Sequence, residues 1–92
     1  MSIEKWLKDL SKSFPNVIYV EERPVVAELR GQIEVPCTED QLKIALVTIV
    51  SNAQERRSSV VVWLDHSFTR DIVCVFVEDT LCLYRLAITE EK

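Results

Sequence analysis

The sequence predicts a single α+β domain in which an antiparallel sheet of about five strands packs against two helices. Two segments carry apolar residues at helical spacing, and each is bounded by residues that cap or break helices. The other apolar segments are short, rich in β-branched residues and separated by polar turns. The chain has 92 residues, and a chain of this size buries only about two thirds of its surface on folding. We therefore expect one modest core and one domain over residues 1–92.

The first expected element is an amphipathic helix. Ser2 is a suitable N-cap, and Glu4 falls in the first turn, where the helix dipole favours an acidic side chain. Pro15 prevents the helix from continuing. Five apolar residues recur at helical spacing and form the face that we expect to pack on the sheet: Ile3, Trp6, Leu7, Leu10 and Phe14.

Two strands are expected after this helix, joined by a tight, charged connection. Val17–Val20 and Val25–Leu29 are rich in β-branched residues, and Pro24 lies in the connection between them. The run 33–35 is expected to be a short extension or an edge piece. Proline has no N–H to donate, so Pro24 and Pro36 fit strand ends or sheet edges.

The second helix begins with a capping-box pattern. The hydroxyl of Thr38 can accept a hydrogen bond from the N–H of Gln41, whose side chain can reach back to the N-cap. A helix that is apolar over so much of its circumference must be covered on two sides, by its own sheet and by either the first helix or a second copy of the protein. One stripe contains Leu42, Ala45, Leu46, Ile49 and Ala53, and Ile44, Val47 and Val50 extend it almost to the opposite side.

Three further strands are expected at 60–64, 72–77 and 81–88, with polar connections between them. The middle strand contains no polar residue, which indicates burial on both faces. The last strand is a candidate sheet edge, where Tyr84 and Arg85 would be available to a partner. The expected order of elements is therefore α-β-β-α-β-β-β.

This element order, at this length, resembles the Roadblock/LC7 family, whose profilin-like fold pairs two copies through the long helix and an edge strand. The resemblance spans residues 3–88 and is carried by element order and helix length. The chain departs from the family at residues 21–24, Glu-Glu-Arg-Pro, where the first hairpin of the family usually has glycine. The resemblance implies a non-catalytic dimeric scaffold, often one that sits on small GTPases or motor complexes. It also implies that the apolar face of residues 42–53 is a dimer surface.

The composition excludes several functional classes. Gly31 is the single glycine, so glycine-rich phosphate-binding loops are ruled out. The net charge of −4 opposes binding to nucleic acid. No apolar run approaches the roughly 18 residues that cross a bilayer, and the first ten residues contain no signal-peptide core. The three cysteines form no C-x-x-C pair, which indicates a reducing compartment. We expect a cytoplasmic protein with neither membrane insertion nor a nucleic-acid partner.

Few residues are candidates for chemistry. Cys37 precedes the second helix, whose N-terminus would lower the pKa of its thiol, and His66 is the single histidine. Asp65, His66 and Ser67 are consecutive and cannot converge in the geometry of a catalytic triad. The cysteines and the histidine lack the spacing of metal ligands. We expect no metal and no cofactor, and the alternative function is a small enzyme or ligand-binding protein that uses Cys37 and His66.

The main expectation is a non-catalytic protein-interaction module: a dimeric scaffold, adaptor or regulatory subunit that pairs with itself or a paralogue and binds a protein partner. Phe68 and Arg70 lie in a polar loop and have the composition of a binding hot spot. The alternative for Phe68 is that it tucks under the sheet and fixes the loop. The candidate interface residues are Ile44, Val47, Val50, Phe68, Arg70, Tyr84 and Arg85.

Overall fold

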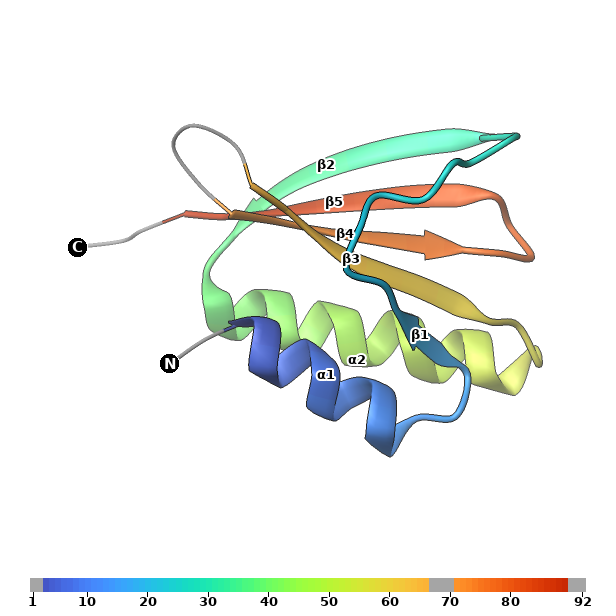
Figure 1. Ribbon diagram of the computed structural model, residues 1–92, viewed down its shortest axis with the longest axis horizontal. Helices are drawn as coiled ribbons and strands as arrows, with labels where there is room; N and C mark the ends of the chain where they lie inside the picture. Colours follow the sequence, from blue (N-terminus) through green and yellow to red (C-terminus); the bar gives the residue numbers. More distant parts are fainter. Residues whose placement is uncertain (1–2, 67–70, 90–92) are drawn as a thin grey trace.

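Two helices lie against one face of a five-stranded sheet in the computed structural model, which describes residues 3–66 and 71–89 (Figure 1). The α+β class, the two helices and the number of strands are as predicted. The predictions for Ser2, Phe68 and Arg70 fall outside the described residues. The elements are α1 (Ile3–Ser13), β1 (Val17–Tyr19), β2 (Gly31–Cys37), α2 (Glu39–Glu55), β3 (Val60–His66), β4 (Asp71–Val77) and β5 (Cys82–Ile88).

The sheet is mixed, and the prediction of an antiparallel sheet is wrong. The strand order is β1-β3-β4-β5-β2. β4 pairs with β3 and β5 in antiparallel fashion, whereas β1 is parallel to β3 and β2 is parallel to β5. α2 carries the chain back along the sheet, so β3 starts at the same end as β2, as a crossover connection requires. The first two strands therefore form the two opposite edges of the sheet and do not pair with each other.

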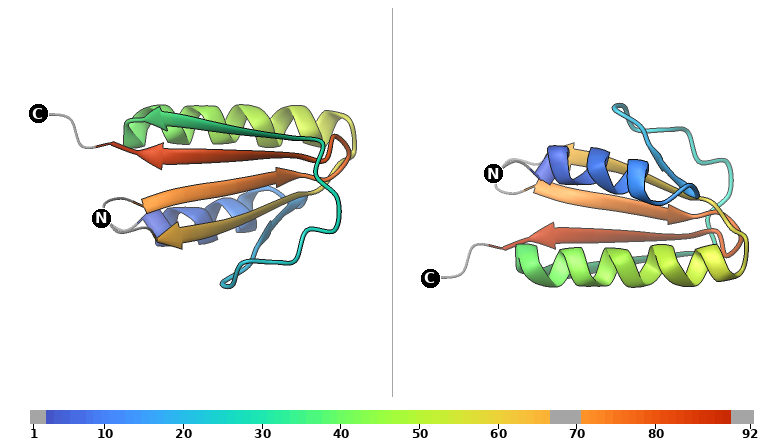
Figure 2. Two further views of the ribbon diagram at one scale, coloured as in Figure 1. Left: turned by 90° about the horizontal axis from the view of Figure 1, so that it is seen from above. Right: turned by 90° about the horizontal axis from the view of Figure 1, so that it is seen from below.

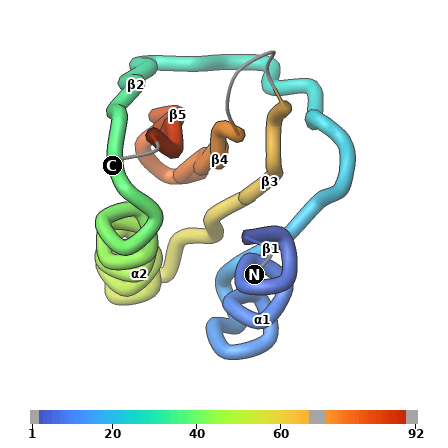
Figure 3. Tube along the Cα trace, turned by 90° about the vertical axis from the view of Figure 1, so that its left-hand side faces the viewer, coloured from blue at the N-terminus to red at the C-terminus, as the bar shows by residue number. Residues whose placement is uncertain are grey.

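The segment Val25–Leu29, predicted to be a strand, is part of a long connection. Residues 20–30, here called the crossing segment, run from β1 to β2 past the sheet face that carries no helix (Figure 3). At its ends, Val20 N donates to Val62 O at 3.0 Å and Arg30 N donates to Leu81 O at 2.8 Å. Val20 and Val26 pack on the sheet. The β-branched residues of this segment thus serve as side-chain anchors, and the second strand is formed by the next residues along the chain.

β5, predicted to be a candidate edge, lies inside the sheet between β4 and β2. Tyr84 and Arg85 are therefore half-buried on an inner strand. The prediction for β4 is confirmed, because every residue after Asp71 in that strand is buried. The edge positions belong to β1, with three residues, and to β2, with seven.

Both helices contribute to one core on their side of the sheet, and they run along it in the same direction (Figure 2). Val50 belongs to this core and is fully buried, which corrects its assignment to an outer face of α2. A smaller cluster occupies the opposite face, beneath the crossing segment. The helix-side core includes Leu7, Leu10, Leu42, Leu46, Val50, Val62, Val73, Val75 and Leu86, and the opposite cluster contains Trp63, Ile72, Cys74, Phe76, Leu83 and Ala87.

The capping box predicted at the start of α2 is confirmed. Gln41 N donates to Thr38 Oγ1 at 3.2 Å, and Thr38 N donates to Gln41 Oε1 at 3.0 Å. The ammonium group of Lys43 lies 5.6 Å from the centre of the Trp6 ring, so a cation–π contact joins α2 to α1. α1 ends at Ser13, two residues before Pro15, as predicted.

The C-terminal end of α2 has the hydrogen bonds of a Schellman motif without its usual glycine. Ser58 N donates to Ala53 O at 2.8 Å and Arg57 N donates to Gln54 O at 3.0 Å. Arg57 has a φ of 62°, in the left-handed region where a Cβ is unfavourable. The position that most often carries glycine is thus occupied by arginine.

Replacing Arg57 by glycine is expected to stabilise the protein. The change removes the steric cost of the left-handed conformation, part of which is offset by the greater freedom of glycine in the unfolded chain. We expect the free energy of unfolding to rise by about 0.5–1 kcal/mol, measured by urea denaturation. Arg57→Ala removes the same charge and keeps the Cβ, so it is the matched control. A glycine variant no more stable than the alanine variant would contradict the prediction.

Candidate functional site

The edge strand β2 exposes apolar side chains beside an unpaired backbone. Ile33 is 50% exposed and Val35 is 39% exposed. Their neighbours across the sheet, Tyr84 and Leu86, belong to the helix-side core or pack against it, so both exposed side chains lie on the helix side of the sheet. α2 does not cover them. β2 forms one border of the sheet (Figure 1). It thus carries a strip of exposed apolar side chains along that border.

The backbone of β2 has free hydrogen-bonding groups on the side away from β5. Cys37 O accepts from Thr89 N at 2.9 Å, so the backbone groups of Cys37 face β5. Successive residues of a strand direct their backbone groups to alternate sides. The groups of Gln32, Glu34 and Pro36 therefore face outward, and Pro36 is the one of these without an N–H to offer.

β2 has few of the features that usually keep an edge strand from pairing with another chain. Native edges are commonly short, or carry lysine or inward-pointing charges. β1 is protected by its length of three residues. In β2, the carboxylate of Glu34 lies 3.5 Å from Arg85 Nε, which compensates its charge, and the proline stands next to the last residue. The middle of this strand is open to another chain.

A second apolar area lies on α2. Ile44 is 70% exposed and Val47 is 36% exposed. Both were sequence candidates. Ile44 projects from the side of α2 opposite the buried stripe of Leu42, Leu46 and Val50, and Val47 lies on the flank of that stripe. α1 reaches the helix at Lys43 through the Trp6 contact and leaves Ile44 uncovered.

Arg85 is held in a polar cluster on the sheet face opposite the helices. Arg85 Nη1 lies 3.4 Å from Asp65 Oδ2 and 3.6 Å from Cys74 Sγ, and Arg85 Nε lies 3.5 Å from Glu34 Oε1. Burial raises the pKa of the Cys74 thiol to about 11, although the positive charge of Arg85 opposes this shift. The guanidinium is thus already paired with two carboxylates, and its arrangement favours a structural role over binding.

The pair proposed for chemistry, Cys37 and His66, does not come together. β4 and β5 lie between β2 and β3, so the two residues are separated by three strand spacings, about 14 Å. Cys37 is buried, and burial raises the pKa of its thiol, opposite to the shift that a reactive thiol needs. His66 Nδ1 instead lies 2.9 Å from Asp71 Oδ1 on the neighbouring strand. This geometry gives the alternative function no support.

The thiols should differ in reactivity in a way that tests this arrangement. Cys37 and Cys74 are buried, whereas Cys82 is partly exposed. At pH 8 a disulfide reagent should therefore react quickly with Cys82 in the native chain and with all three thiols in denaturant, because the thiolate is the reactive form. Mass spectrometry of the labelled protein identifies the sites, and Cys82→Ala is the control that should abolish fast labelling. Fast labelling of Cys37 would contradict the prediction and would support the alternative function, a small enzyme or ligand-binding protein that uses Cys37 and His66.

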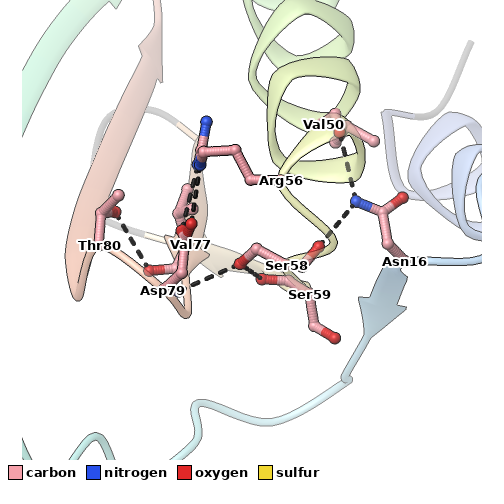
Figure 4. Close-up of polar contacts among 8 residues, drawn as sticks. All are labelled: Asn16, Val50, Arg56, Ser58, Ser59, Val77, Asp79 and Thr80. Carbon is pink, nitrogen blue, oxygen red and sulfur yellow. Dashed lines mark hydrogen bonds and ion pairs between the residues drawn. The ribbon is translucent and has the colours of Figure 1, made fainter.

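Tyr84 lines a shallow cavity between α2 and the β4–β5 turn. Its volume is about 160 Å³, below the 300 Å³ or so at which small-molecule sites usually begin. Arg56, one of its lining residues, donates two hydrogen bonds to the carboxylate of Asp79, at 2.7 and 3.1 Å (Figure 4). These bonds hold the pKa of the Asp79 carboxyl below its ordinary value. The cavity is lined by Ile49, Asn52, Arg56, Val77, Thr80 and Tyr84.

Residues 3–66 and 71–89 contain no cluster of three or more histidine, cysteine, aspartate or glutamate side chains arranged to hold a metal ion. Within the same residues, neither helix is long and apolar enough to span a bilayer. Comparison of the chain with models of protein families, with curated proteins and with solved structures gave no match in any of the three.

Proposed function

We propose that this chain is a non-catalytic protein-interaction module, acting as a scaffold, adaptor or regulatory subunit, that docks another protein chain along β2. The observation that carries the proposal is the open edge of this strand, where exposed Ile33 and Val35 accompany outward-facing backbone groups. Strand addition at such an edge gains affinity from the backbone hydrogen bonds and specificity from alternate side chains. The docked chain is a second copy of the protein or a paralogue.

The exposed residues of α2 extend this proposal. Ile44 and Val47 form a second apolar area on the helix that follows β2 in the chain. The resemblance to the Roadblock/LC7 family also implies pairing through the long helix and an edge strand, although the first hairpin of that family is absent here because β1 and β2 lie at opposite edges of the sheet. Three free cysteines, two of them buried, fit a reducing compartment, and we place the protein in the cytoplasm.

Amide hydrogen exchange tests the proposal residue by residue. The amides of Ile33 and Val35 face β5, so they should be protected at any concentration and serve as internal controls. The amides of Gln32 and Glu34 face outward and should be protected only once another chain docks. The measurement is NMR of the isotopically labelled chain in dilute buffer, at millimolar concentration and in native cell extract. Unprotected exchange at Gln32 and Glu34 under all three conditions would overturn the proposal.

A further inference from the structure

We infer that the chain docked on β2 is a second copy of this protein, with its β2 antiparallel to the first and the two strands centred on Ile33. The inference rests on the proposed function and adds the identity of the partner and the register of the contact. It follows from the position of Pro36 among the outward-facing backbone groups and from the order of side chains along the strand.

The backbone of β2 is complementary to itself in this register. With Ile33 at the centre, Gln32 lies opposite the partner's Glu34, and Glu34 lies opposite the partner's Gln32. Each of these pairs exchanges two hydrogen bonds, as residues in a hydrogen-bonded antiparallel pair do. Every outward N–H of Gln32 and Glu34 is then satisfied, and Pro36 falls outside the paired region, where its missing N–H costs nothing.

The side chains agree with the same register. Ile33 lies opposite the partner's Ile33 in a non-hydrogen-bonded pair, where the Cα atoms approach to about 4.5 Å and side chains are in close contact. Val35 lies opposite the partner's Gly31, which has no side chain to obstruct it. Glu34 faces the neutral amide of Gln32, so no like charges meet. The contact therefore covers the apolar strip that the single chain leaves exposed.

A neighbouring register, centred on Glu34, is less favourable. It keeps an apolar contact between Ile33 and the partner's Val35, but it places Glu34 opposite the partner's Glu34, and like charges directly opposite each other are destabilising. It also sets the carbonyl of Gln32 against the partner's Pro36, which has no N–H to donate. Centring the pair on Ile33 avoids both defects.

A second copy is also the occupant that ends the assembly. Antiparallel pairing of two identical strands is isologous, so one contact closes the free edge of both chains. The other edge of the sheet, β1, has only three residues and offers little for further growth. A dimer with one continuous sheet is thus the expected end state.

Disulfide trapping measures the register directly. In a Cys82→Ala background, which removes the partly exposed native thiol, the variants Ile33→Cys, Glu34→Cys and Val35→Cys are oxidised under the same conditions. Two copies of residue 33 are opposite each other and within disulfide reach, whereas two copies of residue 34 or 35 lie beyond the limit of about 7 Å between Cα atoms. We expect a dimer by sedimentation and efficient cross-linking of Ile33→Cys alone. The Cys82→Ala chain without a new cysteine is the blank.

The outcomes separate this inference from the proposed function. A dimer that cross-links through Glu34→Cys, or through none of the three variants, overturns the register. A chain that stays monomeric at millimolar concentration overturns self-pairing, even if the amides of Gln32 and Glu34 become protected in cell extract, and that protection would leave the proposed function standing. If exchange at these amides is never slowed, both the self-pairing inference and the proposed function are wrong.

Discussion

A chain carrying Val50→Asp is expected to remain unfolded at neutral pH, whereas the same replacement at Ile44 leaves the protein folded. Val50 has no exposed surface and packs in the helix-side core. An aspartate there places a carboxylate among apolar side chains, and the expected cost exceeds about 4 kcal/mol. That loss is comparable to the whole stability of many small domains, which starts at about 5 kcal/mol.

Ile44 is the matched control because it lies on the same helix and is 70% exposed. Ile44→Asp should change the free energy of unfolding by no more than about 0.5 kcal/mol, measured by urea denaturation followed by circular dichroism. A cooperatively folded Val50→Asp chain would show that Val50 faces outward, as the sequence predicted, and that the buried stripe of α2 is assigned to the wrong residues.

Val50 is buried and Ile44 is exposed, and helical periodicity alone does not predict this difference. α2 is apolar around most of its circumference, so several stripes fit the sequence. The buried stripe is Leu42, Leu46, Val50 and Ala53, at spacings of four, four and three residues. Those spacings are visible in the sequence, yet the alternative stripe through Ala45 and Ile49 fits the helical repeat as well. Only the position of the sheet decides between them.

Patterns of neighbouring residues correctly predicted the features that depend on neighbouring residues alone. The capping box of Thr38 and Gln41 and the unbroken apolar run of β4 depend on neighbouring residues, and both are confirmed. The direction and partners of β1 and β2 depend on where the chain goes between them. Val25 and Val26 have the composition of a strand, but they lie in a segment that crosses the face of the sheet, and neither belongs to a strand. The prediction that residues 17–20 and 25–29 form two tightly connected strands was therefore wrong, although their composition favours strands.

The candidate site was predicted only in part, because its position also depends on which strands pair. Residues 33–35 were expected to be either a short extension or an edge piece, and the structure places them in β2 at a sheet edge. The last expected strand, residues 81–88, was instead the candidate edge for a partner. β2 occupies that position by returning across the sheet, and this non-local pairing moved the exposed edge from Tyr84 and Arg85 to Ile33 and Val35.

Asn16 joins three parts of the fold, and its replacement by aspartate should have the second largest effect. Asn16 Nδ2 donates to Val50 O at 3.3 Å and to Ser58 O at 3.1 Å, so it ties the start of β1 to α2 and to the α2–β3 loop (Figure 4). An ionised aspartate has no hydrogen to donate and turns a negative charge toward both carbonyls. We expect Asn16→Asp to lower the free energy of unfolding at pH 7 by about 2–4 kcal/mol.

The loss caused by Asn16→Asp should depend on pH in a direction that identifies its cause. Partial burial and the two facing carbonyls should raise the pKa of the new carboxyl in the folded state above its unfolded value of about 3.9. Stability is then greatest below the unfolded pKa, where the acid is protonated and can donate, and it is lost as the pH rises through the folded pKa. Urea denaturation at pH 4 and pH 7 measures this change. Asn16→Ala removes both hydrogen bonds without adding a charge, so its deficit relative to the unaltered chain should be the same at both pH values. An aspartate variant that matches the alanine variant at pH 7 would show that the amide of Asn16 does not hold these carbonyls.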